Sequence, residues 1–359
     1  MIVGIMKVAE ALASDLLSWY GKRKRSLPWR ETRDPYQIWV SEIMLQQTRV
    51  DTVIPYFERF MEKFPTLHHL AAAEEAEVLK AWEGLGYYSR ARNLHQAVKE
   101  VEERYGGVVP DEEEELIRLP GIGPYTSGAI LSIAYGKKIP AIDGNVLRVA
   151  SRLFAITEDV GRESTRRKIK ELLLTIIPEE APDEFNQALM EIGALVCLPK
   201  APACEECPVR RYCEGKKKGI ESSLPRRKKV EKVKVEQRLT LLLHSPKGVL
   251  MRKRKESLLH GMWEFPNWLL KKGENPLPFL EKELSLLGIP LHEIPRPMGE
   301  VHHVFSHMIW QLSVFLLTLE ERDAAREDKL GDYCWVSKER YHELPVPIPF
   351  QRVYQLNDR

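Results

Sequence analysis

Two glycines spaced one residue apart interrupt a sequence that is helical in character on both sides. Gly121 and Gly123 separate an acidic run, 111–118, from an apolar run, 125–135. Glycines at this spacing let the chain turn sharply and bring its backbone close to a partner. Pro124 suits the first turn of the second helix, whose free N–H groups favour an anion. The stretch predicts a helix–hairpin–helix that binds one phosphate of a nucleic-acid backbone; an ordinary turn between two helices is the alternative.

The chain changes character once along its length. Residues 1–213 show apolar spacings of three and four between short turns, which predicts an almost entirely helical domain. Residues 214–235 are basic and poor in large apolar side chains, which predicts a linker. This linker is either a solvated tether or one that also lies along phosphates. Residues 236–359 have the pattern of strands and predict a separate α+β domain.

The C-terminal segment has its own order of strands and one helix. Residues 238–244 and 248–252 predict a hairpin, residues 278–287 a helix, and residues 308–319 a long strand. Cys334 stands alone in a strand-like segment, where we expect a small buried side chain. The predicted fold is therefore multidomain, with an all-α domain followed by a smaller α+β domain.

Composition and charge argue against several classes of protein. The net charge is only +2, so affinity for nucleic acid has to come from local patches. No run of about 18 apolar residues is present, so we expect no membrane span. The first helix carries Glu10 and Asp15 and lacks a cleavage site, which argues against a signal peptide. Clustered cysteines indicate a reducing compartment, so we expect a cytoplasmic protein, associated with the nucleoid if the cell is prokaryotic.

Four of the five cysteines fall within seventeen residues with the spacing C-x6-C-x2-C-x5-C: Cys197, Cys204, Cys207 and Cys213. Four thiolates this close in sequence suit a tetrahedral site for a soft metal. On ligand chemistry alone, zinc and a four-iron cluster both fit, although the spacing differs from that of the common zinc ribbons. Lys200, Arg210 and Arg211 lie in or beside this loop, where they could contact phosphate or simply face water.

Glu42 lies on another predicted helix, which runs from Pro35 to about Thr48 with Asp34 as its N-cap. This helix is apolar nearly all round, so we expect it to be buried. A carboxyl in such surroundings is hard to ionise, which is the property that a general acid needs near neutral pH. The alternative is a structural ion pair between Glu42 and an arginine, and periodicity alone does not separate the two.

Together these pieces resemble the MutY family of adenine DNA glycosylases, within the endonuclease III superfamily of helix–hairpin–helix DNA glycosylases. The resemblance covers essentially the whole chain. Its motifs are Leu27-Pro-Trp-Arg30, Trp39 to Thr48, Trp82 to Asn93, Leu119 to Gly123, Ile142 to Arg148 and the four cysteines. It implies a monomer that acts on double-stranded DNA carrying adenine opposite 8-oxoguanine or guanine. The enzyme would flip the adenine and hydrolyse its bond to deoxyribose, leaving an abasic site in base excision repair.

The resemblance also assigns catalytic roles. Glu42 resembles the acid that protonates adenine N7, and Asp143, eighteen residues after Tyr125, resembles the residue that stabilises the oxocarbenium-like sugar. Asp143 also predicts the N-cap of a helix over 146–154, and both roles can hold. Tyr125 and Asn145 resemble the neighbours that orient Asp143 and the water. Endonuclease III relatives have a nucleophilic lysine at the position of Tyr125, so we expect a monofunctional glycosylase.

Two further segments resemble the loops that enter the duplex beside the lesion, and their residues are Gln46, Gln47, Thr48, Leu85 and Tyr87. Tyr87 would stack as a wedge, and Gln47 would contact the opposite base. In the hairpin, Gly121 and Gly123 would approach the phosphate. Solvation at a helix end and packing in the core are the alternatives for the glutamines and the tyrosines.

Residues 236–359 resemble the MutT-like, or Nudix, domain that this family carries. A Nudix hydrolase needs the motif R-E-x-x-E-E to hold Mg²⁺, and the comparable helix, 279–288, lacks it. We therefore expect this domain to recognise 8-oxoguanine without hydrolysis, through the loop Phe305-Ser306-His307. The cysteine spacing is that of the iron–sulfur loop of the superfamily, which implies one [4Fe-4S] cluster held by the four cysteines.

The resemblance implies two lobes with the active cleft between them: a helical-barrel lobe over about 23–135, and a cluster lobe made of 1–22 and 136–213. Other functions fit less well. A bifunctional lyase needs a lysine near the hairpin, and Lys137 and Lys138 lie at the wrong end of the next helix. A DNA-binding module without catalysis predicts no pairing of a buried acid with a capping aspartate, and a nucleotide hydrolase needs the missing R-E-x-x-E-E.

Overall fold

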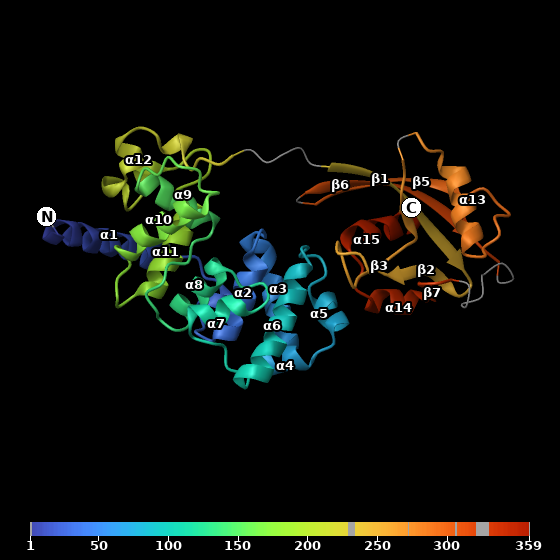
Figure 1. The fold of residues 1–359 in the computed structure, drawn as a ribbon, viewed down its shortest axis with the longest axis horizontal. Helices are drawn as coiled ribbons and strands as arrows, with labels where there is room; N and C mark the ends of the chain where they lie inside the picture. Colours follow the sequence, from blue (N-terminus) through green and yellow to red (C-terminus); the bar gives the residue numbers. More distant parts are fainter. Residues whose placement is uncertain (1, 229–233, 272, 306, 321–329, 359) are drawn as a thin grey trace. The chain divides into compact units, whose positions relative to one another are not determined.

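A computed structural model of the chain describes residues 2–228, 234–271, 273–305, 307–320 and 330–358. Contacts divide the chain into two compact units: Met1–Ala72 with Asn93–Val230, and Ala73–Arg92 with Glu231–Arg359. The first unit is helical, and a β-sheet with its helices forms most of the second (Figure 1). The predicted change from an all-α to an α+β domain is confirmed. Residues 73–92 group with the second unit, although the predicted helical-barrel lobe includes them.

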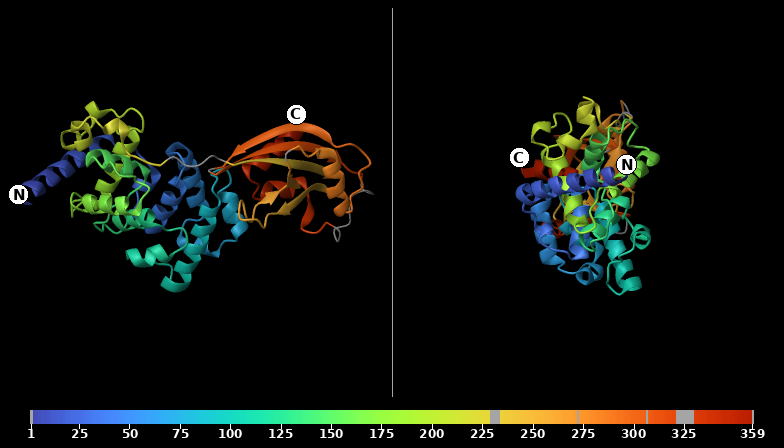
Figure 2. Two further views of the ribbon diagram at one scale, coloured as in Figure 1. Left: turned by 45° about the horizontal axis from the view of Figure 1, so that its top comes forward. Right: turned by 90° about the vertical axis from the view of Figure 1, so that its left-hand side faces the viewer.

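Helices make up almost all of the first unit, and Figure 2 shows them from two further directions. They are α1 (Ile2–Arg23), α2 (Pro35–Leu45), α3 (Val50–Lys63), α4 (Leu67–Ala72), α6 (Ser89–Tyr105), α7 (Glu113–Arg118), α8 (Pro124–Ile133), α9 (Gly144–Leu153), α10 (Glu163–Leu174), α11 (Pro182–Leu195) and α12 (Glu214–Lys217). Helix α6 begins in the second unit, to which α5 (Glu75–Ala81) belongs entirely.

Two apolar cores hold the elements that surround the candidate site. The larger core joins α1, α9, α10 and α11 through buried side chains such as Leu16, Val149, Ile169 and Phe185. A smaller one joins α2 to α8, and these two helices pack closely. Packing in these cores holds α2, α8, α9 and α11 in place. Each Å² of apolar surface that the cores remove from water stabilises the fold by about 25 cal/mol.

Capping residues fix where the functional helices begin. Asp34 accepts a hydrogen bond from the backbone N–H of Tyr36 at 3.0 Å, and Pro35 occupies the first helical position, as predicted. Asp143 is the N-cap of α9, as predicted for the helix over 146–154. Helix α2 ends at Leu45, earlier than the predicted Thr48, because Gln47 has a φ of +58° that an α-helix does not allow.

The second unit is built on one seven-stranded sheet. Its strands are β1 (Lys234–Ser245), β2 (Gly248–Lys253), β3 (Trp263–Glu264), β4 (Asn267–Leu269), β5 (Arg296–Val304), β6 (Met308–Thr318) and β7 (Tyr333–Val336). The order is β3-β2-β1-β6-β5, with β4 also paired to β1 and β7 to β2. Strands β1 and β6 are parallel and the other pairs antiparallel. The predicted hairpin of β1 and β2 is confirmed.

Helices contact the sheet through two separate groups of side chains. Alternate residues of β1, among them Leu239 and Leu241, pack with Leu280 of α13 (Pro276–Leu286). Another group is aromatic, where Phe265 stacks with Tyr341 of α14 (Lys338–Glu343) and meets Phe350 of α15 (Ile348–Gln355) edge to face. The predicted helix over 278–287 is therefore present with slightly earlier bounds.

The structure differs from the predicted linker, 214–235, at both ends. The segment that follows the last clustered cysteine forms α12 and then packs against α9, where Leu224 is buried. Gly215 permits this contact, because a Cβ there would lie 2.5 Å from the carbonyl oxygen of Arg152. Arg226 forms a β-bridge with Asp159, and β1 already begins at residue 234. The basic composition of this segment predicted a linker throughout, because its few apolar side chains gave no sign that part of it packs against α9.

Helix α8 offers a test of how closely the first unit is packed. A Cβ on Gly128 would lie 2.6 Å from the carbonyl oxygen of Pro140. We expect Gly128→Ala to lower the free energy of unfolding by about 1–3 kcal/mol, because backbone has to move. The control is Gly21→Ala in α1, where no atom lies within 4 Å of the added Cβ, and alanine should stabilise by about 0.5–1 kcal/mol. Urea unfolding measures both; equal effects of the two variants would contradict the packing.

Candidate active site and cysteine loop

A cavity of about 460 Å³ opens among α2, α8, α9 and α11 in the first unit. It is lined by the four predicted catalytic residues: Glu42, Tyr125, Asp143 and Asn145. Gln46, Gln47 and Thr48 lie on its wall as well. The fold thus brings together side chains from three distant parts of the sequence.

Glu42 is buried at the cavity wall, with 4% of its surface exposed. Burial raises the pKa of its carboxyl to about 7. A hydrogen bond from the hydroxyl of Tyr125 lowers that pKa, and the negative charge of Asp143 raises it. At neutral pH a large share of Glu42 therefore carries a proton. The ion pair considered from the sequence does not form within the described residues, because the neighbouring arginines bind a different carboxylate.

Asp143 occupies the N-terminus of α9. Its Oδ1 accepts from the backbone N–H of Val146 at 2.7 Å, and its Oδ2 accepts from the Nδ2 of Asn145 at 2.8 Å. Burial raises the pKa of the Asp143 carboxyl above its usual value, and the hydrogen bonds from Val146 and Asn145 offset part of that rise. These donors, with the helix dipole, favour the ionised form. Asp143 is the N-cap of α9, as predicted, and it also lines the cavity; its role toward the sugar stays a prediction.

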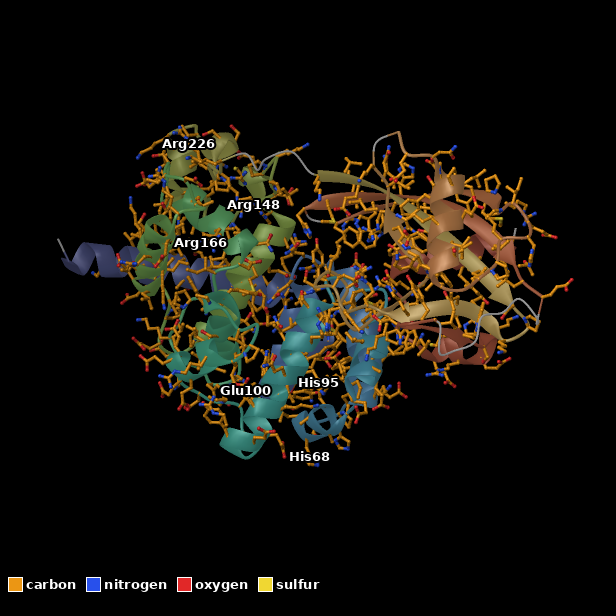
Figure 3. All side chains as sticks on the ribbon, turned by 45° about the vertical axis from the view of Figure 1, so that its right-hand side comes forward. His68, His95, Glu100, Arg148, Arg166 and Arg226 are labelled. Carbon is orange, nitrogen blue, oxygen red and sulfur yellow. The ribbon has the colours of Figure 1, made fainter. Side chains whose placement is uncertain are left out.

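A chain of hydrogen bonds runs from Asp143 along α9 to the cysteine loop. Asn145 accepts through Oδ1 from the Nη2 of Arg148 at 2.9 Å. Arg148, labelled in Figure 3, also donates from Nε to the carbonyl oxygen of Cys197 at 2.8 Å and from Nη2 to that of Gly193 at 2.7 Å. Gly193 allows α11 to approach α9 this closely, since a Cβ at that position would lie only 2.6 Å from the Cβ of Asn145. The predicted neighbour Asn145 is therefore held from both sides.

Tyr125 has a different contact from the one the sequence indicated. Its hydroxyl donates to the Oε2 of Glu42, whereas we expected it to orient Asp143. Burial raises its pKa well above the usual value, as do the neighbouring carboxylates. The phenol therefore keeps its proton at neutral pH and can donate a hydrogen bond.

A buried ion cluster on the cavity wall was missed by the sequence analysis. The carboxylate of Glu191 on α11 accepts from the Nη2 of Arg25 at 2.7 Å and from that of Arg30 at 2.9 Å. Burial alone would raise its pKa, but these hydrogen bonds lower it to about 2. Arg30 belongs to the motif Leu27-Pro-Trp-Arg30 that was recognised in the sequence. Glu191 lies 161 positions away, so no local sequence pattern indicates that the two residues pair.

The hairpin has the geometry that its glycines predicted. Gly121 has a φ of +78°, and a Cβ there would lie 2.7 Å from the Cβ of Asn93, so only glycine fits. Gly123 is the N-cap of α8, and no atom lies within 4 Å of the position of its Cβ. Pro124 takes the first helical position. The start of α8 therefore has the predicted backbone shape; the binding of phosphate there stays a prediction.

The segments predicted to read the lesion fall into two places. Gln46 donates through Nε2 to the Oγ1 of Thr126 at 3.3 Å at the cavity, and Gln47 follows with its positive φ. In the second unit Tyr87 has a φ of +49° and is 41% exposed. Leu85 is buried instead.

A hollow of about 340 Å³ in the second unit contains Tyr87 on one wall and the predicted 8-oxoguanine loop on another. Phe305 and His307 line it, and Ser306 lies outside the described residues. The ring of Phe305 meets those of His303 and Trp310 edge to face, with centroids 4.5 and 4.9 Å apart. The predicted wedge and the predicted loop therefore line one hollow of the second unit.

The four clustered cysteines line one small cavity beside α9. Burial raises the pKa of Cys207 to about 12, and it also raises the pKa values of Cys204 and Cys213. These thiols keep their protons unless a cation replaces them. Among the described residues, no group of three or more His, Cys, Asp or Glu is arranged to hold a single metal ion. The donor set, four soft sulfur atoms around one cavity, suits a thiolate-bound metal centre.

The basic residues of this loop are engaged with acids. Arg210 pairs with Glu205, and Arg211 pairs with Asp15 of α1 at 2.6 Å. Lys200 is exposed. The predicted contacts of these residues with phosphate remain untested.

None of the described helices is both long and apolar enough to cross a lipid bilayer.

Two family models match the chain. Residues 40–175 match the HhH-GPD superfamily of base excision DNA repair proteins, and residues 239–356 match the NUDIX domain. The adenine DNA glycosylase of Rattus norvegicus is 35% identical over 96% of this chain and 78% of its own length. That of Homo sapiens is 34% identical, covering 97% and 74%, and that of Buchnera aphidicola from Schizaphis graminum is 31% identical, covering 95% and 97%.

Solved structures resemble the helical part. A thermostable thymine-DNA glycosylase aligns with a TM-score of 0.54 and 30% identity, covering 59% of this chain and 98% of that one. A trapped covalent intermediate of endonuclease III with DNA aligns with a TM-score of 0.50 and 25% identity, covering 58% and 95%.

The pKa of Glu42 predicts how stability depends on pH. The folded state holds a proton on Glu42 up to about pH 7, whereas the unfolded chain releases it near 4.5. Above pH 7 the buried charge costs the folded state roughly 3 kcal/mol, and this cost disappears as pH falls from 7 to 4.5. Glu42→Gln should therefore be more stable than the wild type at pH 8, and the difference should shrink by pH 5.

Urea unfolding of both proteins at the two pH values measures this difference. Glutamine resembles the protonated carboxyl, so other titrating groups cancel. A variant that is no more stable than the wild type at pH 8, or whose advantage does not change with pH, would contradict the raised pKa.

Proposed function

This chain belongs to the family of adenine DNA glycosylases, and we propose that it hydrolyses the bond between deoxyribose and an adenine paired with 8-oxoguanine or guanine. The product is an abasic site, and the strand stays intact. The observation that carries this proposal is a pair of largely buried carboxyl groups that line one cavity and have different hydrogen-bond partners. Glu42 has a pKa of about 7, while Asp143 is bound by donors at a helix N-terminus. Two such environments give one proton donor and one anion near neutral pH.

The adenine leaves the duplex and enters the cavity, at a cost that is least at a mispair. Glu42 transfers its proton to N7, and the C1′–N9 bond breaks with its electron pair moving to the base. The sugar becomes oxocarbenium-like, and the Asp143 carboxylate stabilises its positive charge. A water oxygen then bonds to C1′, and its proton returns to a carboxylate. Asn145 holds Asp143 in place.

Tyr125 supports hydrolysis over strand cleavage. A lyase needs an amine that forms a Schiff base with the sugar, and the phenol of Tyr125 has none. Its hydrogen bond to Glu42 instead fixes the orientation of the acid. We infer that the phenol also stabilises the Glu42 carboxylate once its proton has moved to the base.

The cluster proposal rests on the donor set of the loop. Four partly buried cysteines around one cavity fit a [4Fe-4S] cluster, to which each would give one thiolate. When bound, the cluster would hold the loop in a defined shape. Cys197 follows α11 and accepts from Arg148 through its carbonyl oxygen, so this shape also affects the residues behind Asp143.

We propose that the second unit contacts the base opposite the adenine. Tyr87, Phe305 and His307 share a hollow there, and helix α13 lacks the acidic motif that a Nudix hydrolase uses for Mg²⁺. The unit would therefore bind 8-oxoguanine without hydrolysing nucleotides. We infer a monomer that works in the cytoplasm, at the nucleoid in a prokaryotic cell, because the substrate is DNA and the clustered cysteines suit a reducing compartment.

The first test uses a labelled duplex with adenine opposite 8-oxoguanine under single-turnover conditions. We expect the wild type to yield a cut strand only after hot alkali, since an abasic site persists until then. Glu42→Gln should retain binding and lose about 10²-fold or more in rate, because general acid catalysis is removed. The rate should fall as pH rises through about 7.

The exposed Glu171 on α10 provides the matched control, since Glu171→Gln changes the same group away from the cavity. Strand cleavage without alkali, with a product trapped by borohydride, would identify a lyase and contradict the role of Tyr125. Binding with no excision would mean a DNA-binding module.

Tyr87 should contribute to binding of the mispaired duplex. Stacking of an aromatic ring on a base is worth about 1–3 kcal/mol, so Tyr87→Ala should raise the Kd by about 5- to 100-fold. The measurement is a titration in the Glu42→Gln background, which leaves the duplex uncut. Tyr105→Ala, at the far end of α6, is the control. An unchanged Kd, or an equal loss on a fully paired duplex, would remove Tyr87 as the wedge.

A further inference from the structure

One charged side chain in the core of the first unit has no role in the chemistry above. Arg152 on α9 is 2% exposed and ranks among the largest fully buried side chains. It lies about one helical turn beyond Arg148, on the part of α9 that leads from Asp143 to the cysteine loop. Burying an arginine is costly unless its charge is balanced and its N–H groups are bonded.

The guanidinium of Arg152 donates hydrogen bonds to the chain on both sides of the cysteine loop, just after Cys197 and again beyond Cys213. Its Nη1 donates to the carbonyl oxygen of Leu198 at 2.7 Å, and its Nη2 to that of Pro199 at 2.9 Å. Its Nε donates to the carbonyl oxygen of Leu224 at 3.0 Å. These acceptors come from the segment after the first cysteine and the segment after the last one. One side chain thus joins the two ends of the loop.

Arg152 also contacts two of the cysteines directly. Its Nη1 lies 3.2 Å from the Sγ of Cys197, in hydrogen-bond geometry. The Sγ of Cys213 lies 3.3 Å from the main-chain oxygen of Arg152. Gly215 allows this approach, because any Cβ would collide with the same oxygen. Arg152 is therefore in contact with the first and the last members of the predicted ligand set.

The charge of this guanidinium has no carboxylate partner within the described residues, and its acceptors there are four carbonyl oxygens and one sulfur. Carbonyl dipoles satisfy N–H groups but carry no net negative charge. Four thiolates around a [4Fe-4S] centre would supply that charge at the same place. A hydrogen bond to a cluster sulfur also raises the reduction potential, since it stabilises the more negative, reduced state.

We propose that Arg152 is a positioning residue for the metal centre: it holds Cys197 and the two ends of the cysteine loop in place and balances the negative charge of the bound thiolates. This inference rests on the [4Fe-4S] cluster of the proposed function. It predicts that Arg152 controls retention and reduction potential of the cluster.

The experiment compares the full-length wild type with Arg152→Gln and Arg152→Lys. Glutamine removes the charge and most donors, whereas lysine keeps the charge and loses the planar fork. The readouts are iron and sulfide per chain, the rate of iron loss to a chelator, and the reduction potential on an electrode. We expect Arg152→Gln to lose iron about 10-fold faster or more and to have a more negative potential. Arg152→Lys should fall between the two.

Arg254→Gln is the control. Arg254 is also buried, at 4% exposure, and donates from Nε to the carbonyl oxygen of Leu258 at 2.9 Å; unlike Arg152 it pairs with a buried carboxylate, that of Glu264, and it lies in the second unit. This variant should leave iron content and potential unchanged. A general effect of removing a buried arginine would appear in both variants.

The outcomes separate the two proposals. A wild type that holds zinc or no metal overturns the cluster and this inference with it. A wild type with four irons, beside an Arg152→Gln variant with the same retention and potential, overturns this inference alone. If Arg152→Gln does not fold, Arg152→Lys decides the question, since an unchanged potential and unchanged iron loss in it would mean that neither the fork nor the sulfur contact matters. A shift in potential supports the proposal, because a structural role alone would alter retention only.

Discussion

Burial of the Glu42 carboxyl between α2 and α8 is the interaction on which the rest of the site depends. Its pKa of about 7 follows from desolvation, and the hydroxyl of Tyr125 fixes its direction. An ionised Asp143 across the cavity raises that pKa further, so each carboxyl favours the state that the other needs. The arrangement costs stability when Glu42 is charged. The apolar packing of α2 and α8 has to offset this cost, which explains why the α2 sequence is apolar on nearly every side.

Helix α9 connects the cavity that contains Asp143 to the cysteine loop. Its N-cap is the proposed catalytic anion, and its next turns carry Asn145, Arg148 and Arg152 toward the cysteine loop. Each of these side chains is bonded to the one before it or to the loop itself. Because these contacts are continuous, we expect a displacement of the loop to shift Asp143 as well. The proposed metal centre would then influence the proposed excision rate without touching the substrate.

Much of this could be predicted from the sequence because the signals are local. Short stretches of sequence are enough to recognise the cap at Asp34, the hairpin glycines and the cysteine spacing. The apolar composition of the helix that carries Glu42 likewise predicts that the helix is buried. The Glu191 cluster could not be predicted, because its arginines lie more than 160 positions away. Two other differences have local causes: α2 stops early at the positive φ of Gln47, and the basic segment after Cys213 packs through Gly215 and Leu224.

Residues 73–92 group with the C-terminal sheet, so the residues proposed to contact the opposite base belong to a different unit from the proposed catalytic residues. Glu83 accepts a hydrogen bond from the backbone N–H of Val346 at 3.0 Å, and Lys80 donates to the carbonyl oxygen of Leu344 at 3.1 Å. These two side chains also pair with each other at 2.7 Å, just before the turn that carries Tyr87. The proposed wedge, Tyr87, thereby belongs to the same unit as Phe305. If these proposed roles hold, changes at Glu42 leave the proposed contact with the opposite base intact and changes at Tyr87 leave the proposed acid intact, so we expect binding and excision to be separable by mutation.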